Sequence, residues 1–394
     1  MGAESVSITD ISLERLSDCQ QLSATVDGER IWYKLPADLE LVPRPEAFLA
    51  PALFEAMVRG VPVRIEDGSP VSKRLLHSLV EIQSILNCWN KDLNIVPIHA
   101  RASEDYPVTD HVACCFSGGV DSSYTYSRQR NAITHLLLVQ GFAAGRGGPD
   151  DWHENIEARR KFAASENKSL IAVHTNVMRF LSTRDLSILL THGAVLGGLG
   201  AGLGLKQLLI PATYTFSNLM PWGSHPMLDP LWSTETTTVV HHGADASRVE
   251  KTVSIAKLQY MLDQLQVCWY AGGRNCGVCG KCMRTALALH LLGGKTGNLP
   301  PYRESGQLKL LKQVDAQGFP YLSELARMAE DADETAIARR LRRYLRSYRF
   351  RNVASEFARE IIGERGRALI RRIRPHAWHN SRGTLQSVRI STHR

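Results

Sequence analysis

Residues 112–122 read VACCFSGGVDS, and this stretch decides which fold we expect. The apolar run at 112–116 is typical of a strand buried on both faces of a parallel sheet. The two glycines that follow allow a tight turn, after which we expect a helix that reaches about Arg130. The amides at such a helix start, together with the positive end of the helix dipole, favour a bound anion.

Strands and helices alternate after this stretch. We expect strands at 133–139, 170–174 and 207–213, with helices at 150–167 and 186–205 between them. This alternation predicts an α/β fold, in which crossover helices cover a Rossmann-like parallel sheet. The uncharged segment 186–205 is long enough to cross a membrane, but six of its residues are glycine. We therefore expect a buried helix there and no membrane span.

The regions on either side of this core have a different pattern. Strands at 30–35, 61–65 and 95–99 and helices at 45–59 and 71–90 predict an α+β N-terminal extension over residues 1–108. A long, poorly structured stretch is expected at 216–242, followed by a helix at about 245–265. Residues 109–300 form the predicted central domain, and residues 301–394 a helical, arginine-rich C-terminal region.

The hexapeptide SGGVDS at 117–122 is the first candidate site. Ser117 and Ser122 offer hydroxyl donors to a phosphate, and Asp121 could cap the helix or help to hold Mg²⁺. The loop lacks the lysine of a Walker A motif and the glycine spacing of a dinucleotide fingerprint. It predicts a nucleotide phosphate site of another kind, and an ordinary strand-to-helix turn is the alternative.

Four cysteines form the second candidate site, with the spacing C-x7-C-x2-C-x2-C. Four thiolates in a glycine-rich loop predict a closed tetrahedral Zn²⁺ site, and an iron–sulfur cluster is the alternative. The chain has eight cysteines in all, too sparse for a disulfide framework. The expected zinc ligands are Cys268, Cys276, Cys279 and Cys282.

The complete SGGVDS after an apolar strand resembles the PP-loop of the ATP pyrophosphatase superfamily. With the cysteine knuckle, residues 110–295 look like a divergent relative of the 7-cyano-7-deazaguanine synthase family. The resemblance implies an adenine nucleotide alpha-hydrolase-like fold for the predicted central domain. It also implies ATP, Mg²⁺ and structural Zn²⁺ as cofactors. It further implies a cytoplasmic ligase that adenylates a carboxylate or similar oxygen, releases AMP and pyrophosphate, and forms a C–N bond.

The resemblance assigns residues in the loop and supports the four cysteines as zinc ligands. It implies nucleotide contacts along the whole loop and catalytic roles for three of its members. The nucleotide-binding residues would be Ser117, Gly118, Gly119, Val120, Asp121 and Ser122, with Ser117, Asp121 and Ser122 catalytic. The family's Asp–Cys–Arg element is missing between the fourth strand and the knuckle, so the acceptor is not implied.

Candidate substrate residues lie between the fourth strand and the knuckle. Asp229 could orient a substrate amine or end a turn, and His225 could act as a general base. Arg248 and Lys251, about one turn apart on a predicted helix, could reach a substrate or form a solvated face.

Two other functions stay open. A PP-loop RNA sulfurtransferase would need a reactive cysteine outside the metal site, whereas Cys114 and Cys115 have the pattern of core residues. A nucleotide-binding subunit that acts on a partner's substrate is the non-enzymatic alternative.

The net charge of +8 is concentrated at the C-terminus. Residues 339–394 contain 16 arginines, no lysine and three acids, a net charge of +13, so the other 338 residues carry −5. An amphipathic helix docked on the body is expected at 334–373, and its arginines could contact nucleic acid. The first ten residues lack a signal-peptide pattern, which favours a cytoplasmic location. A homodimer is a further expectation, and the acceptor could be a small molecule or a macromolecule.

Overall fold

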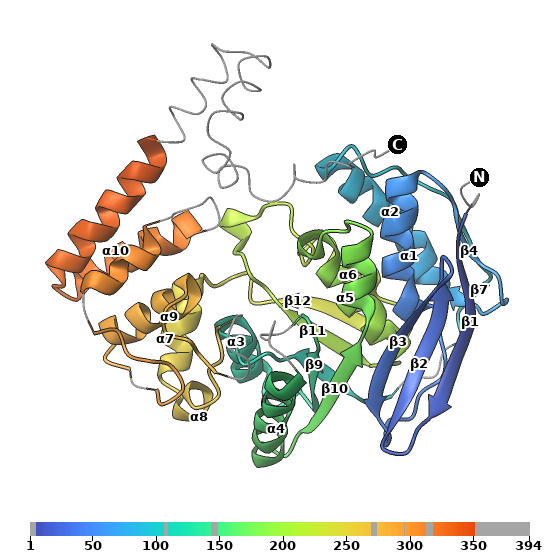
Figure 1. The fold of residues 1–394 in the computed structure, drawn as a ribbon, viewed down its shortest axis with the longest axis horizontal. Helices are drawn as coiled ribbons and strands as arrows, with labels where there is room; N and C mark the ends of the chain where they lie inside the picture. The colour runs from blue at the N-terminus through green and yellow to red at the C-terminus, as the bar shows by residue number, and fades with distance from the viewer. Residues whose placement is uncertain are drawn as a thin grey trace, which may run out of the picture. The chain divides into compact units, whose positions relative to one another are not determined.

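The computed structural model describes residues 5–105, 109–142, 149–268, 274–294, 296–303, 305–312 and 318–350. These residues form two compact units, one that runs to Asp245 and one that begins at Ala246. Figure 1 shows the helices and strands of each unit in chain order.

A parallel sheet forms the centre of the first unit. Its strands are β8 (Val112–Cys115), β9 (His135–Val139), β10 (Ser169–Thr175), β11 (Gln207–Pro211) and β12 (Thr238–His242). They lie in the order β12-β11-β8-β9-β10, and each neighbouring pair is parallel. Numbered along the chain, this order is 5-4-1-2-3, which is the doubly wound arrangement.

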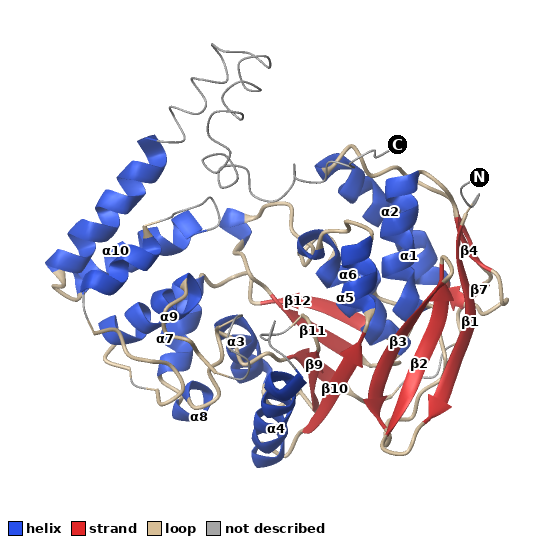
Figure 2. Ribbon diagram, in the orientation of Figure 1, coloured by secondary structure: helices blue, strands red, loops and turns tan. Residues whose placement is uncertain are grey.

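Helices cover both faces of these strands. The connecting helices are α3 (Val120–Gln129), α4 (Pro149–Ser165), α5 (Val177–Thr183) and α6 (Ile188–Gly202). Figure 2 shows α3 and α4 on one side of the parallel strands and α5 and α6 on the other. Because the chain changes direction along the sheet after β10, the carboxyl ends of β8 and β11 flank the topological switch point.

The N-terminal strands continue the same sheet. They are β1 (Val6–Arg15), β2 (Cys19–Val26), β3 (Glu29–Pro36), β4 (Val63–Ile65) and β6 (Ile98–His99). Tyr33 and Lys34 of β3 pair antiparallel with Thr175 and His174 of β10, which gives one sheet of ten strands. Strands β5 (Val71–Ser72) and β7 (Ala102–Ser103) form a separate pair, and helices α1 (Glu46–Arg59) and α2 (Lys73–Trp89) complete the region.

Helix α6 packs unusually close to its neighbours because of its glycines. A Cβ at Gly193 would clash with the carbonyl oxygen of Gly223 and lie 2.7 Å from the Cα of Ser224. At Gly202 it would lie 2.7 Å from the Cβ of Ala47 on α1. The expected buried helix is confirmed, and the glycines bring the segment around Ser224 against it.

The second unit is helical. It contains α7 (Arg248–Ala256), α8 (Gln259–Leu262), α9 (Gly280–Leu291), α10 (Gly318–Asp331) and the 3₁₀ segment η3 (Ser305–Leu311), and residues 335–350 form a last helix. Ser247 and Glu250 form a capping box that starts α7. Helices α9 and α10 meet where the Tyr321 hydroxyl donates a hydrogen bond to the Arg284 carbonyl at 3.3 Å.

These observations confirm the predicted α/β class, with a mostly parallel central sheet and flanking helices. The expectation of a poorly structured stretch at 216–242 is wrong in part, because it contains strand β12 and the short 3₁₀ segments η1 (Phe216–Asn218) and η2 (Asp229–Trp232). The helix expected at 334–373 is present at 335–350, and residues 351–394 lie outside the described part. No helix among the described residues is long and apolar enough to cross a membrane.

Candidate functional sites

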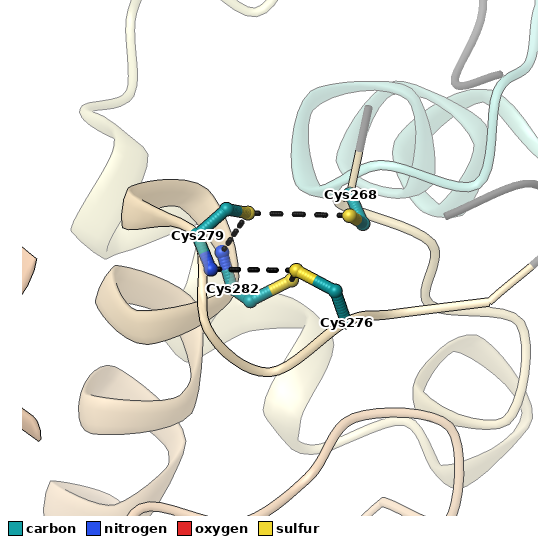
Figure 3. Close-up of side chains that lie close together, drawn as sticks. All are labelled: Cys268, Cys276, Cys279 and Cys282. Carbon is teal, nitrogen blue, oxygen red and sulfur yellow. Dashed lines mark hydrogen bonds between the residues drawn. The ribbon is translucent and has the colours of Figure 1, made fainter. Parts of the chain in front are cut away.

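The four predicted cysteines meet at one point in the second unit. Figure 3 shows that Cys276, Cys279 and Cys282 turn their sulfur atoms toward Cys268, which comes from a separate segment. All four Sγ atoms lie within 4.8 Å of one another. The sulfurs of Cys276 and Cys282 are 3.9 Å apart, and those of Cys268 and Cys279 are 4.0 Å apart.

These separations fit one tetrahedral metal ion. Zinc–sulfur bonds of about 2.3 Å place the corners of a regular tetrahedron about 3.8 Å apart. In a [4Fe–4S] cluster each thiolate binds a different iron, and in a [2Fe–2S] cluster the thiolates bind in pairs to two irons, so in neither cluster do all four sulfurs stand this close together. The site can therefore hold a single ion and is compatible with zinc. Four protein ligands leave no open position, which is the pattern of a structural site.

The backbone around the cysteines favours this arrangement. Cys279 is the N-cap of α9, and its sulfur accepts a hydrogen bond from the Cys282 amide at 3.4 Å. The sulfur of Cys276 accepts one from the Cys279 amide at 3.3 Å. Gly277 between them has a φ of +70°, a conformation that other residues rarely adopt. Each amide donates to a sulfur that would carry negative charge, which lowers the free energy of the thiolate form.

Asn275 joins the two segments that carry the ligands. Its buried side chain accepts hydrogen bonds from the amides of Val267 at 2.8 Å and Cys268 at 3.2 Å. Its Nδ2 donates to the carbonyls of Leu265 at 2.8 Å and Asn298 at 2.6 Å. One side chain thus fixes the position of Cys268 relative to the knuckle, and the sequence motif did not reveal it.

Electrostatics also favour a bound cation at the cysteines. Burial raises the pKa of the Cys279 and Cys282 thiols above the ordinary value. Without a cation these thiols stay protonated at neutral pH. A metal ion would stabilise the thiolates and release their protons.

The SGGVDS loop lies at the carboxyl end of β8 in the first unit. Gly118 has a φ of +77°, which makes the turn, and Gly119 is the N-cap of α3. The Ser117 hydroxyl accepts a hydrogen bond from the Gly119 amide at 3.3 Å, and the Ser122 hydroxyl donates to the Gly119 carbonyl at 3.1 Å. Val120 is fully buried, so the loop is anchored in the core. The first amides of a helix have no partners within it, and here they follow directly after the glycine turn.

A buried arginine lies near Phe116, the residue that directly precedes this loop. The Arg159 guanidinium of α4 is 5.8 Å from the centre of the Phe116 ring, and Phe116 directly precedes Ser117. Arg159 is 3 % exposed, and its Nε donates to the Oδ1 of Asn155 at 3.3 Å. Burial lowers the pKa of Arg159 to about 10, so the side chain is still positively charged at neutral pH.

Asp229 lies in a buried cluster at the same edge of the sheet. Its Oδ2 accepts hydrogen bonds from the Ser224 hydroxyl and from Nδ1 of His241, both at 2.7 Å. Its Oδ1 accepts one from the His225 amide at 3.2 Å, and the residue is fully buried. Burial raises the pKa of Cys115 at the end of β8, and the Asp229 carboxylate is close enough to raise it further. The geometry therefore shows Asp229 holding its own segment, with three protein donors on its two oxygens.

The two histidines of this cluster differ in their chemistry. Nδ1 of His225 accepts a hydrogen bond from the Met227 amide at 3.1 Å, so the neutral ring carries its hydrogen on Nε2. Burial lowers the pKa of His225, which keeps the ring neutral. His225 is thus arranged as a donor at Nε2, and its role as a general base stays a prediction. His241 donates from Nδ1 to Asp229, which leaves its Nε2 as the basic nitrogen.

Arg248 and Lys251 lie on α7 of the second unit, and their role in substrate binding stays a prediction. Lys251 is buried and Arg248 is half-buried. Cys114 is fully buried, as the sequence predicts for a core residue, whereas Cys115 is half-buried. Burial raises the pKa of both thiols well above the ordinary value, and neither would be a thiolate at neutral pH.

No protein-family model matches this chain, and no curated protein or solved structure matches it either.

The sequence interpretation missed Asn275, Arg159, Ser224 and His241. The sequence held a weak signal for Ser224 and His241. Ser224 stands five residues before Asp229, and His241 directly follows the apolar pair at 239–240. Recognising β12 as a strand would have placed His241 at the carboxyl edge of the sheet. Asn275 and Arg159 carry no comparable signal, because their roles depend on contacts made only in the folded chain.

Proposed function

We propose that the chain is an ATP-dependent, AMP-forming ligase that adenylates a carboxylate or similar oxygen and transfers nitrogen to it. The observation that carries the proposal is the position of SGGVDS, a glycine turn and helix start at the carboxyl end of β8. Ligands of doubly wound sheets bind at this edge, beside the switch point between β8 and β11. The hexapeptide also resembles the PP-loop, which implies cleavage between the α and β phosphates.

In this proposal the loop binds the departing pyrophosphate. The first amides of α3 and the hydroxyls of Ser117 and Ser122 would donate hydrogen bonds to its oxygens. The charge of Arg159 next to Phe116 would add attraction for a polyanion in a low-dielectric environment. Electrostatic stabilisation of the leaving group would then be the main catalytic contribution. Mg²⁺ would neutralise phosphate charge, and Asp121 is the loop residue that would help to hold it.

The cluster at Asp229 would serve the acceptor side. The imidazole of His241, whose side chain is 3 % exposed, is oriented by Asp229, and its Nε2 would take a proton from a nitrogen nucleophile. Asp229 would act through His241, as a positioning residue, because its own oxygens already bind three protein donors.

The nearby segment after β11 suggests the character of the acceptor. Phe216 is 62 % exposed and Met227 is 53 % exposed, although both are large apolar side chains. In the sequence they lie on either side of Trp222, whose ring packs edge-on against Tyr214 at 5.5 Å. Exposed apolar side chains in this segment would suit an acceptor with a flat, apolar part.

The metal site would be structural. Zinc would tie the segment of Cys268 to the N-terminus of α9 and so stabilise the second unit. The sulfurtransferase alternative needs an accessible thiolate, and the raised pKa values of Cys114 and Cys115 count against it.

A calorimetric titration with ATP and with pyrophosphate tests the loop. We expect Ser117→Ala and Arg159→Gln each to weaken pyrophosphate binding about tenfold or more, because the first removes a hydrogen-bond donor and the second a buried positive charge near the loop. Arg160→Gln is the matched control, since Arg160 is the exposed neighbour of Arg159 and pairs with Glu157. Equal affinities for pyrophosphate in the unchanged protein and all three variants would refute the assignment of the loop. Exchange of labelled pyrophosphate into ATP, run with a series of carboxylic acids, would then identify the acceptor.

A further inference from the structure

The last helix, residues 335–350, has two faces of opposite character. Its apolar residues are buried: Ile337 and Leu345 are 5 % exposed and Leu341 is fully buried. The helix lies antiparallel to α10, because Arg342 pairs with Glu330 at 2.7 Å and the ring of Tyr348 lies 5.1 Å from that of Phe319. The apolar face is therefore already used for packing within the second unit.

The opposite face carries positive charge and one aromatic ring. At 100° per residue, Arg339, Arg343, Arg346 and Phe350 lie within an arc of about 60°. The three arginines are exposed, and Phe350 is 77 % exposed. We call these four residues the arginine face. The six arginines of residues 335–350 have no acidic residue among them, and within the described part of the chain only Arg342 makes an ion pair.

We propose that the arginine face binds a single-stranded polynucleotide through its phosphates, independently of the proposed ligase activity. Guanidinium groups match the geometry of phosphate and donate two parallel hydrogen bonds to it. Residues 335–350 contain six arginines and no lysine. The spacing from Arg339 to Arg343 is about 6 Å along the helix axis, so successive side chains can follow an extended backbone. Phe350 offers an exposed ring on which an unpaired base can stack.

A membrane surface suits this helix less well. An amphipathic helix binds a bilayer by inserting its apolar face, and in this chain Ile337, Leu341 and Leu345 are buried against protein. The charged face alone would then have to hold the protein on the lipid. A duplex also fits less well, because it has no unpaired base for Phe350.

The test uses the full chain and a fluorescent uridine oligomer of about 20 nucleotides, long enough for one site of this kind. The triple variant Arg339→Gln, Arg343→Gln, Arg346→Gln removes three charges from the arginine face. The control triple variant Arg15→Gln, Arg64→Gln, Arg128→Gln removes three exposed charges from the first unit. Fluorescence anisotropy at several salt concentrations gives the affinity and its salt dependence, and thermal unfolding checks that both variants fold.

We expect the arginine-face triple to bind at least tenfold more weakly near 0.15 M salt. We also expect its slope of log affinity against log salt to be smaller by about 2, since each phosphate contact on a single strand contributes about 0.7. Phe350→Ala should weaken binding about fivefold or more. The control triple should bind like the unchanged protein.

Four results would overturn the proposal. Equal losses in both triples would mean that only total charge matters, and wild-type affinity in the arginine-face triple would mean that this face is not used. Tighter binding of a duplex of the same length would contradict a single-strand site. Binding of anionic phospholipid vesicles or polyglutamate through the same arginines, without oligomer binding, would assign the face to another partner.

Discussion

The side-chain oxygen of Asn275 accepts a hydrogen bond from the backbone amide of Cys268 at 3.2 Å, and this bond connects the two parts of the metal site. Cys268 approaches from the segment after α8, whereas the other three cysteines belong to the knuckle and to the start of α9. Without Asn275 the amides of Val267 and Cys268 would lose this link to the segment that carries the other three ligands.

Replacing Asn275 should weaken the metal site while leaving all four ligands in place. We expect Asn275→Ala to lower the affinity for Zn²⁺ about 10- to 100-fold, the usual effect of removing a group that orients a ligand. Competition with a chromophoric chelator measures this affinity. Asn218→Ala, at an exposed position in the first unit, is the control. An unchanged zinc affinity in Asn275→Ala would show that the Cys268 segment is positioned by other contacts.

Removing a ligand should affect folding as well as metal content. We expect the purified chain to contain one zinc ion and Cys279→Ser to contain much less. The variant should also unfold at lower temperature, because binding free energy at such sites is partly folding free energy. Elemental analysis and thermal unfolding give both quantities. A brown protein with about four iron atoms per chain would instead indicate an iron–sulfur cluster.

The contact between α6 and the segment before Asp229 can be tested with one methyl group. Gly193→Ala would force the Gly223 carbonyl and Ser224 to move, so we expect the free energy of unfolding to fall by about 1–3 kcal/mol. Urea unfolding measures this change. Gly297→Ala is the matched control, because its Cβ would meet nothing within 4 Å. Equal stability of the two variants would contradict the close packing at Gly193.

Acid should destabilise the protein through His135. Burial, with a smaller contribution from His111, lowers the pKa of His135 to about 4, although Asp38 opposes the shift. Between pH 6.5 and about 4 the unfolded chain therefore binds more protons at this site than the folded one. The stability contribution is complete above pH 6.5 and is lost as the pH falls toward 4.

The variant His135→Gln should show a smaller loss of unfolding free energy across this pH range than the unchanged protein. Urea unfolding at a series of pH values measures the difference. His77→Gln, at an exposed position of α2, serves as the control. Parallel pH profiles for all three proteins would mean that His135 does not carry the effect.

The sequence predicted the parts of the fold that depend on local patterns. The apolar runs at 112–116 and 170–174 are strands β8 and β10, because buried parallel strands have few polar residues. Strands β1 and β2 were missed, since their mixed polar and apolar residues show no such run. The Asp27-Gly28 pair that turns β2 into β3 was the available signal, with both residues at positive φ.

The candidate sites also differ in how much of them the sequence predicted. The cysteine spacing predicted a metal site because ligands close in sequence are also close in space, and the structure confirms that all four meet. The partners of Asp229 could not be predicted, because Ser224 and His241 reach it from a loop and from a strand that pairs with β11.

The identity of the nucleotide product tests the central claim most directly. The full chain is incubated with ATP labelled at the α phosphate, Mg²⁺, an ammonium salt as the nitrogen nucleophile and the acceptor found by pyrophosphate exchange, beside Ser117→Ala, whose fold is checked by thermal unfolding. We predict labelled AMP with an equal amount of pyrophosphate, and a loss of turnover of at least 100-fold in Ser117→Ala, as for removal of a donor that stabilises developing charge. ADP and phosphate as products, or AMP formed equally fast by Ser117→Ala, would contradict the account.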